Sequence, residues 1–367
     1  MSRARDFADL AGSADAGGIS GKNVLVNGAM QVAQRSTSQT GLGASDGYFT
    51  LDRFKVDHGA TSAGRYTMSQ SAVTDLAGFP NALKIDCTTA DTSIAAGEAL
   101  ILNQKIEGLA CQSLKASSTS TNAFTLSFYA KSNASRAIAS EILLTEGTNR
   151  QISKLHTIGT SWARYTMTVP AASSTEIDND NTDAMQVQFW LHGGSTYTGG
   201  TLNTASLASL TNANRAAGIG SIFASTDNTI EITGVQLEVG AATPFEHRSF
   251  GDELARCQRY FQMQVSGTGV APNTTACDFN IQLQTSMRDS PTISSQDGEM
   301  QITNVTAADF NSSSLTVSGA SSRSGGDALY QGGRVRLSGF SGLTAGDDYI
   351  IDVNTDNSGK ITYDAEL

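Results

Sequence analysis

The chain has 367 residues, of which 36 are glycine, 5 are proline and 16% are charged. Its formal net charge of −11 opposes attraction to phosphate backbones, so we expect no nucleic-acid partner. No apolar run approaches the roughly 20 residues of a membrane helix, and residues 1–19 lack a hydrophobic signal region; we therefore expect neither membrane insertion nor export by a signal peptide. The length predicts two packed domains and a short tail.

Residues 1–22 are expected to form an attachment peptide at the N-terminus. Arg3, Phe7 and Leu10 lie at helix-compatible spacing, and a Gly/Ser/Ala run follows from 12 to 21. A segment this short cannot bury a core of its own, so it is either a flexible tail or a peptide that becomes ordered on a partner.

Residues 23–262 show alternation of apolar and polar side chains with a period of two, which is typical of half-buried strands. It is clearest at 186–192, where one phase is apolar and the other holds the polar side chains and Trp190. Parallel strands covered on both faces would read as continuous apolar runs. No helical stretches alternate with the strands, so we expect an all-β fold, an antiparallel jelly-roll or β-sandwich domain.

The last strand of this domain, at 230–239, changes phase. Ile230 and Ile232 share one phase, whereas Val235, Leu237 and Val239 lie in the other. One extra residue at 233 or 234 would return the apolar side chains to one face, which predicts a β-bulge there.

One short helix is expected to close the sandwich domain. Ser249 can cap it together with Asp252. Phe250, Leu254, Cys257 and Phe261 follow at helical spacing and are expected to pack on the sandwich.

A smaller β-rich domain is expected at 263–367. Alternation recurs there in short runs, for example at 279–283 and 349–353. Residues 352–363 read as a hairpin with its turn at 356–359.

No catalytic residue, metal ligand or cofactor is expected, so the chain is not predicted to be an enzyme. The Gly43-Ala44-Ser45-Asp46-Gly47 run matches a nucleophile elbow, but it lies in a loop where that chemistry needs a strand, a turn and a helix. The histidines are scattered, and the aspartates at 178, 180 and 183 lie in a polar connection. Four widely spaced cysteines predict buried thiols: Cys87, Cys111, Cys257 and Cys277.

Two aromatic residues, Trp190 and Tyr129, occupy the polar phase of their strands. Burial between the sheets does not explain them, so three interpretations remain open. The rings could stack on a glycan, they could contact a neighbouring subunit, or a loop or the C-terminal domain could cover them.

Several segments resemble a family of phage tail and appendage proteins. They are 23–35 (Asn-Val-Leu-Val-Asn-Gly-Ala-Met-Gln-Val-Ala-Gln-Arg), 51–54 (Leu-Asp-Arg-Phe), 104–108, 126–131, 162–170, 232–248 and 253–262. The resemblance implies a jelly roll similar to that of carbohydrate-binding modules, with a sugar-binding or structural role on the virion. Residues 2–10 resemble the N-terminal pieces by which phage fibre proteins attach to a tail, and 361–367 resemble C-termini of this group.

These features predict a tail-fibre or tail-appendage subunit of a virion, assembled in the host cytoplasm. Its expected partners are other virion tail proteins, two further copies in a homotrimer, and a host-surface polysaccharide. Arg53 is expected to pair with Glu246 or Glu238 and so tie the terminal strands together. Two alternatives stay open: a head decoration or horn-like capsid appendage with the same jelly roll, and a glycan depolymerase with a carboxylate pair.

Overall fold

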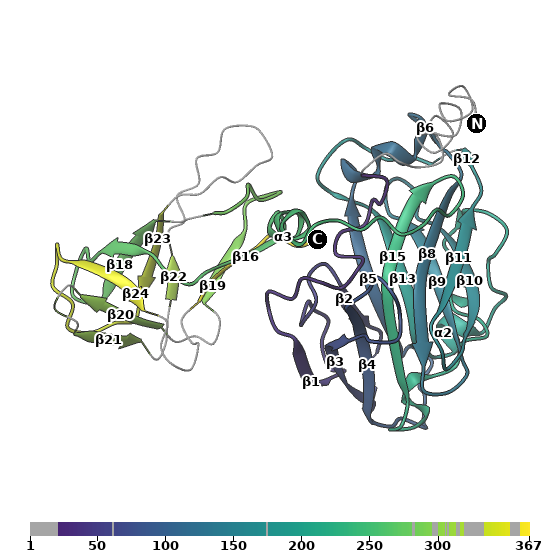
Figure 1. Ribbon diagram of the computed structural model, residues 1–367, viewed down its shortest axis with the longest axis horizontal. Coiled ribbons are helices and arrows are strands. Elements are labelled where there is room, and N and C mark those ends of the chain that lie inside the picture. Colours follow the sequence, from purple (N-terminus) through teal and green to yellow (C-terminus); the bar gives the residue numbers. More distant parts are fainter. Residues whose placement is uncertain are drawn as a thin grey trace, which may run out of the picture. The chain divides into compact units, whose positions relative to one another are not determined.

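The computed structural model describes residues 21–60, 62–173, 175–280, 283–295, 300–304, 306, 308–312, 316–318, 334–352 and 360–367 (Figure 1). The chain forms two compact units that divide between Glu253 and Leu254. The sequence placed its boundary later, after residue 262. The predicted attachment residues Arg3, Phe7 and Leu10 lie outside the described residues.

The first unit is a sandwich of two six-stranded sheets whose named strand pairs are antiparallel. Sheet A has the order β1 (Ser38–Leu42), β3 (Arg65–Ala72), β4 (Asn81–Thr89), β15 (Thr229–Val239), β8 (Phe124–Ser132) and β11 (Ala163–Val169). Sheet B has the order β14 (Ala208–Ser209), β10 (Arg150–Ile158), β9 (Arg136–Leu144), β13 (Asp183–Gly193), β5 (Ala99–Glu107) and β2 (Lys55–His58). The predicted antiparallel jelly-roll sandwich is confirmed.

Short elements complete this unit. A small sheet joins β12 (Ala172–Ser173), β7 (Ser120–Thr121) and β6 (Lys115–Ser117). Single helical turns are η1 (Ala110–Leu114), α2 (Ser195–Thr198), η2 (Asn212–Asn214) and η3 (Ile222–Ala224). Among the described residues no helix is both long and apolar enough to cross a membrane.

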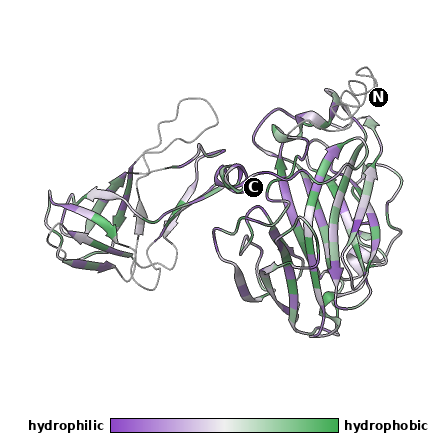
Figure 2. Ribbon diagram, in the orientation of Figure 1, coloured by the Kyte–Doolittle hydropathy of each residue, from purple (hydrophilic) through white to green (hydrophobic). Residues whose placement is uncertain are grey.

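The alternation of side chains builds the core between the sheets. Val187 and Phe189 of β13 are each 1% exposed and belong to one cluster with Leu126 and Phe128 of β8. Figure 2 shows this as a change between hydrophobic and hydrophilic residues along the strands. The burial of apolar surface from both sheets therefore stabilises the sandwich.

The β-bulge predicted in β15 is confirmed. The register of β15 with β8 shifts between Thr233 and Gln236, and β15 pairs with β4 only up to Ile232. Gly234 adopts φ +59° at this point, and a Cβ atom there would lie 2.8 Å from the rings of Phe79 and Tyr129. Glycine is therefore required by both backbone conformation and space.

Beyond the bulge, an N-terminal strap formed by residues 21–32 runs along β15. The N–H of Val24 donates to the carbonyl of Leu237 at 3.0 Å, and the N–H of Val235 donates to Gly28 at 2.9 Å. The strap thus forms hydrogen bonds with the part of β15 beyond Ile232, where β15 no longer pairs with β4.

The predicted helix is present as α3 (Phe250–Gln258). The Ser249 hydroxyl accepts the N–H of Asp252 at 3.2 Å, which confirms the predicted cap. The expected apolar packing is wrong for Phe250, which is 56% exposed. Glu253 in the first turn of the helix, 6% exposed, accepts the N–H of Asn27 at 2.5 Å, and both residues belong to the first unit.

The second unit contains two sheets around its own core. Sheet F has the order β21 (Asp309–Ser312), β20 (Met300–Asn304), β24 (Asp348–Asp352), β17 (Thr268–Val270), β18 (Ala276–Asn280), β23 (Arg334–Ser338) and β22 (Thr316–Ser318). Sheet E has the order β16 (Phe261–Gln264), β25 (Ile361–Asp364) and β19 (Thr292–Ser295).

The hairpin predicted at 352–363 is wrong. Strand β24 pairs with β17 and β20, whereas β25 pairs with β16 and β19 in the other sheet. Alternation indicates which side chains of a strand are buried, but it does not identify the strand's partner. The predicted turn at 356–359 lies outside the described residues.

The four cysteines are buried, as predicted. Burial raises the pKa of the Cys277 thiol to about 12. Burial also raises the pKa of Cys87 and Cys111, so these three thiols stay protonated at neutral pH and behave as small apolar core groups.

Candidate functional site

The outer face of sheet B carries polar side chains from three neighbouring strands. Asn103 of β5 lies in register with Lys55 of β2 on one side and Gln188 of β13 on the other, and Lys105 lies in register with Gln186. We call this set the polar row, which comprises Lys55, Asp57, Asn103, Lys105, Asp183, Gln186 and Gln188. Four of its side chains are 20–21% exposed: Lys55, Asp57, Lys105 and Asp183.

The members of the polar row are hydrogen-bonded to one another. The Asn103 amide donates to Asp57 at 2.8 Å and to Gln186 at 3.0 Å, and Gln186 donates to Asp183 at 2.6 Å. Lys55 pairs with Asp57 at 2.6 Å, and Lys105 pairs with Asp183 at 3.4 Å. Burial raises the pKa of the Asp183 carboxyl. The network fixes these side chains before any ligand arrives.

One acceptor in the polar row remains unused. Asn103 is fully buried, and its Oδ1 has no hydrogen-bond partner among the described residues. An unpaired buried acceptor costs free energy, so this amide is a strained point of the network.

Trp190 lies on the same face of sheet B, where its ring is buried. It is 0% exposed, its indole N–H donates to Glu141 at 2.7 Å, and the rings of Trp190 and Tyr197 are 5.0 Å apart. The Arg215 guanidinium lies 4.7 Å from the ring centroid and donates to Glu141 at 3.0 Å. Residues 194–222 therefore cover the ring, and the interpretation of intramolecular cover is the correct one for Trp190.

Tyr129 lies on the outer face of sheet A and is half-buried. Its ring is 5.2 Å from that of Phe79 and 5.9 Å from the Arg164 guanidinium. Phe79 in turn contacts Phe245 and His247 at 5.1 and 5.0 Å, so the segment after β15 covers this cluster. The two predicted aromatic residues are on different sheets and do not form one site.

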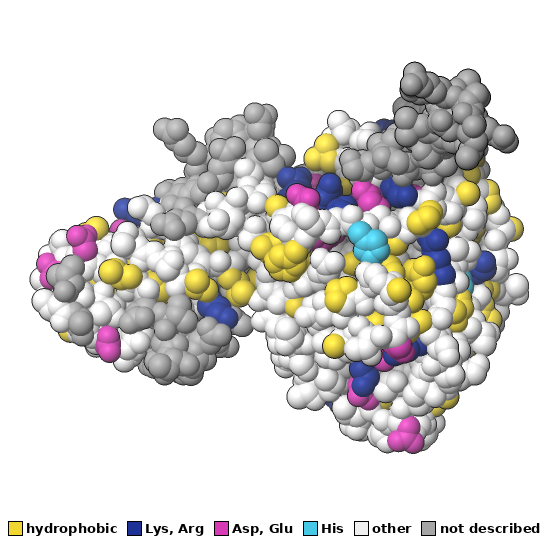
Figure 3. All heavy atoms as spheres, in the orientation of Figure 1, with side chains coloured by type: hydrophobic (Ala, Val, Ile, Leu, Met, Phe, Trp, Pro, Cys, Tyr) yellow, Lys and Arg dark blue, Asp and Glu magenta, His cyan; other side chains and the backbone are white. Residues whose placement is uncertain are grey.

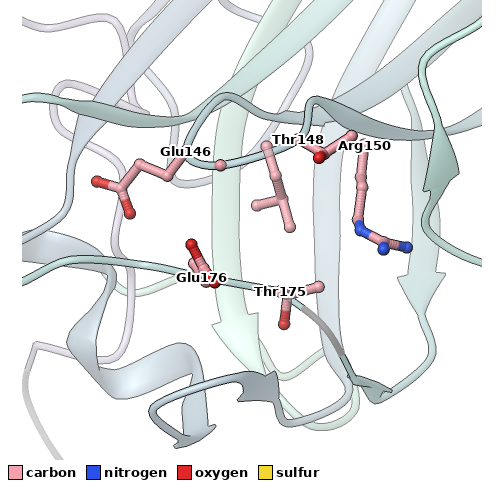
Figure 4. A pocket seen from close by; sticks show the side chains of 7 residues that line it. Glu146, Thr148, Arg150, Thr175 and Glu176 are labelled. Atoms are coloured by element: carbon pink, nitrogen blue, oxygen red, sulfur yellow. The ribbon is translucent and has the colours of Figure 1, made fainter.

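A pocket of about 280 Å³ lies at one end of β9 and β10 (Figure 4). Glu146 and Thr148 come from the turn that joins these strands, Arg150 is the first residue of β10, and Thr175 and Glu176 come from the segment after β12. Leu144 and Gly147 complete the lining. Sequence reasoning missed this pocket because its two sides are remote in sequence, and the segment after β12 reads as a solvated connection.

The polar groups of the pocket retain unused hydrogen-bonding capacity. Glu146 Oε2 accepts the N–H of Asp178, whereas Oε1 has no partner in the described part of the chain. Burial raises the pKa of the Glu146 carboxyl. Thr175 is 3% exposed and its hydroxyl is likewise unpartnered. Within the described ranges, no group of three or more His, Cys, Asp or Glu side chains is placed to hold a metal.

A group of charged and polar side chains built on Arg248 joins the two terminal segments. Glu246 accepts the N–H of Asn23 at 2.8 Å and pairs with Arg248 at 3.7 Å. Arg248 also donates to the carbonyl of Leu25 at 2.9 Å and pairs with Glu253 at 3.4 Å. We call Asn23, Glu246, Arg248 and Glu253 the terminal lock.

Glu238 and Arg53 have other partners in the described part of the chain. Glu238 accepts the N–H and hydroxyl of Thr243 at 2.8 and 2.6 Å. Arg53, 1% exposed, donates to the carbonyl of Lys105. The pairing of Arg53 with Glu246 or Glu238 stays a prediction.

No protein-family model and no curated protein sequence matches the chain. Among solved structures, tailspike protein 4 of bacteriophage CBA120 is similar with a TM-score of 0.30 and 14% identity, over 60% of this chain and 22% of that one. A carbohydrate-binding module of the CBM4 type has a TM-score of 0.30 and 15% identity, over 58% of this chain and 98% of that one. TmCBM61, solved with β-1,4-galactotriose, has a TM-score of 0.29 and 11% identity, over 59% of this chain and 99% of that one. The chain thus spans less than a quarter of the tailspike chain, and likeness at this level transfers no ligand or activity.

Proposed function

We propose that this chain is a non-enzymatic structural protein that binds glycan on the outer face of sheet B. The observation that supports glycan binding is the polar row, which presents amide, carboxylate and ammonium groups from three adjacent strands. Sugar hydroxyls both donate and accept hydrogen bonds, and side-chain amides do the same. A fixed set of such groups on rigid strands is suited to recognise them.

The charge of the polar row favours a ligand rich in hydroxyl groups over a polyanion. Its two lysines pair with its two aspartates, so the formal charge of the row is balanced. Figure 3 shows a similar mixture on the visible face, where acidic and basic side chains lie near one another. A ligand therefore meets no strong field of either sign.

We further propose that the protein is a tail-fibre or tail-appendage subunit of a phage virion, assembled as a homotrimer with residues 1–22 attached to the tail. What supports this proposal is the resemblance of segments 23–35 and 232–248 to phage appendage proteins. In the structure both segments contribute residues to the terminal lock, including Asn23 and Glu246. Such a role requires no catalysis.

Binding to immobilised bacterial surface polysaccharides tests the glycan proposal. Lys105→Ala and Gln186→Ala should each weaken binding to a recognised polysaccharide by about tenfold, which corresponds to one lost charged or amide hydrogen bond. Lys84→Ala is the matched control, because Lys84 also pairs with an aspartate, Asp86 at 3.1 Å, but on sheet A. An equal loss of polysaccharide affinity in all three variants, or no loss in any of them, would reject the polar row as the site.

The same polysaccharides test the absence of catalysis. The chain length of each polysaccharide is measured by size-exclusion chromatography before and after incubation with the protein. We expect it to stay unchanged. Shortening that is lost in Glu146→Gln or Glu176→Gln would show a depolymerase and overturn the non-enzymatic assignment.

A further inference from the structure

The pocket between the β9–β10 turn and residues 175–176 contains charged groups that have no partner in the part of the chain the structure describes. Among the described residues, the side chains of Arg150 and Glu176 take part in no hydrogen bond or ion pair, although both line the pocket. Glu146 keeps one carboxylate oxygen without a partner. We propose that this pocket binds a single sugar unit that carries a protonated amino group, an inference that rests on the glycan-binding function proposed above.

The turn brings Glu146 to the same pocket as Glu176. Gly147, between Glu146 and Thr148, has φ +64°, and a Cβ atom on it would lie 3.1 Å from Glu176 Oε2. A larger residue would be strained at this φ and would crowd the Glu176 carboxylate. Glycine therefore allows Glu176 to lie over the turn that carries Glu146.

The carboxylates favour a cationic ligand group. Glu146 is half-buried, its Oε1 is unpartnered, and burial disfavours its charged form. An ammonium group placed beside it would supply both a hydrogen-bond donor and the missing positive charge. Glu176 provides a second negative charge at the same opening.

Arg150 distinguishes a sugar from a metal ion. Its guanidinium repels a divalent cation at the glutamates about twice as strongly as it repels a single ammonium charge at the same distance. It can instead donate to the hydroxyl or ring oxygens of a sugar, which carries acceptors beside its amino group. The Thr148 and Thr175 side chains also line the pocket and can bond further hydroxyls.

The size and position of the pocket fit one unit of a longer glycan. Its volume of about 280 Å³ lies just below the range of about 300–1,000 Å³ for small-molecule sites. Thr145, which precedes Glu146, donates to the backbone carbonyl of Asp183 at 2.5 Å. Asp183 belongs to the polar row, so the pocket lies next to the end of that row.

Titration of the full-length protein with glucosamine, N-acetylglucosamine and glucose tests the proposal. Binding is measured by calorimetry or ligand-observed NMR at about pH 6.5, where an amine of this kind is protonated. Glucosamine should bind at least about tenfold more tightly than either neutral sugar, equivalent to one charge-assisted hydrogen bond. Equal binding of the three sugars, or no binding of glucosamine, would overturn the proposal.

Variants identify the groups responsible. Glu176→Gln and Glu146→Gln should each reduce glucosamine affinity by about tenfold, because each removes a charge and keeps an acceptor. Asp227→Asn is the control, since Asp227 is an exposed carboxylate far from the pocket in sequence and absent from its lining. Unchanged affinity in both glutamine variants, or tight calcium binding that displaces glucosamine, would reject an amino-sugar pocket.

The two proposals can fail separately. If glucosamine does not bind but Lys105→Ala still weakens polysaccharide binding, the pocket assignment is wrong and the polar row remains a glycan site. If glucosamine binds but no polysaccharide does, the polar row assignment is wrong instead.

Discussion

The carboxylate of Glu246 accepts the backbone N–H of Asn23 at 2.8 Å, although the two residues are 223 positions apart. The same carboxylate accepts the N–H of Gly21, and Asn23 in turn accepts the N–H of Leu237 through its side chain at 3.0 Å. The terminal lock thus fixes the strap to the last strand of the sandwich.

Replacement of Glu246 by Gln should destabilise the first unit by about 2 kcal/mol at pH 7, because charge-assisted hydrogen bonds are lost. Burial opposes the charged form of Glu246, but the Asn23 and Gly21 N–H groups and the charges of Arg248 and Lys22 outweigh it and lower its pKa. Because the folded-state pKa is lowered, the ionised carboxylate stabilises the fold at pH values above its ordinary pKa of 4.5. This stabilisation is lost as the pH falls through the folded-state pKa. The difference from wild type, measured by urea unfolding, should therefore narrow below about pH 4.5.

Glu231→Gln is the control for that experiment. Glu231 pairs with Lys131 at 3.8 Å on the outer face of sheet A. A partly exposed pair of this kind contributes at most about 1 kcal/mol. A loss in Glu246→Gln no larger than in Glu231→Gln would contradict the importance of the terminal lock.

Gly28→Ala should destabilise the first unit by about 3 kcal/mol or more, because a Cβ atom would lie 2.1 Å from the Val235 carbonyl oxygen. This contact is where the strap pairs with β15. Gly251→Ala in α3 is the matched control, since no heavy atom lies within 4 Å of its added Cβ. That variant should change stability by less than about 1 kcal/mol in thermal unfolding.

Arg215→Met should destabilise the sandwich by about 3–5 kcal/mol at pH 7, because Glu141 is 0% exposed and would lose its ion-pair partner. Burial already raises the pKa of Glu141, and removal of Arg215 should raise it further. Because the folded-state pKa is raised, the protonated carboxyl stabilises the fold fully at pH values below its ordinary pKa of 4.5. This stabilisation is lost as the pH rises through the folded-state pKa. The difference in free energy of unfolding between wild type and Arg215→Met should therefore become smaller toward acidic pH.

The matched double variant Glu141→Met/Arg215→Met separates charge burial from lost packing. It should be more stable than Arg215→Met at pH 7, because no unpaired charge remains in the interior. Fluorescence of Trp190 in a Trp162→Phe background reports whether the ring becomes exposed. A double variant less stable than Arg215→Met would contradict this account.

His156 should make the sandwich sensitive to acid. It is 5% exposed, contacts Ser140 at 2.8 Å, and burial followed by the charge of Lys154 lowers its pKa to about 4. The neutral form of His156 stabilises the fold above pH 6.5, its ordinary pKa. About 3 kcal/mol of the free energy of unfolding is lost as the pH falls from 6.5 to 4. His156→Gln should flatten this part of the stability profile, whereas His247→Gln, at an exposed position, should not.

Deletion of residues 1–20 should abolish incorporation into phage particles if the N-terminal peptide attaches the subunit to the tail. The deleted protein retains Gly21 and the terminal lock, so its thermal unfolding should match that of the full chain. Electron microscopy of particles and light scattering of the purified protein provide the measurements. Normal incorporation of the shortened protein would show that attachment lies elsewhere.

Alternation and phase predicted the sheets and the bulge well, because both depend on local side-chain burial. The phase change in β15 indicated an extra residue at 233–234, where the register shift lies. The pairing of β24 with β17 and β20 could not be predicted, because partner choice depends on contacts distant in sequence.

The candidate site was predicted less well. Trp190 was identified as unusual because it lies in a polar phase, but no local pattern indicates that residues 194–222 fold over it. The acidic residues of the pocket come from two separate segments, and neither has a motif of its own. Folding brings them together, so their proximity was invisible in the sequence.

The terminal lock also determines how tension would pass through the first unit. The chain enters beside Glu246 through Gly21 and leaves toward α3 just after Arg248. A force applied between these two points acts on the hydrogen bonds of the terminal lock. It does not act on the hydrogen bonds between the strands of either sheet. If the N-terminal segment anchors the chain as proposed, tension on it would leave the shape of sheet B unchanged.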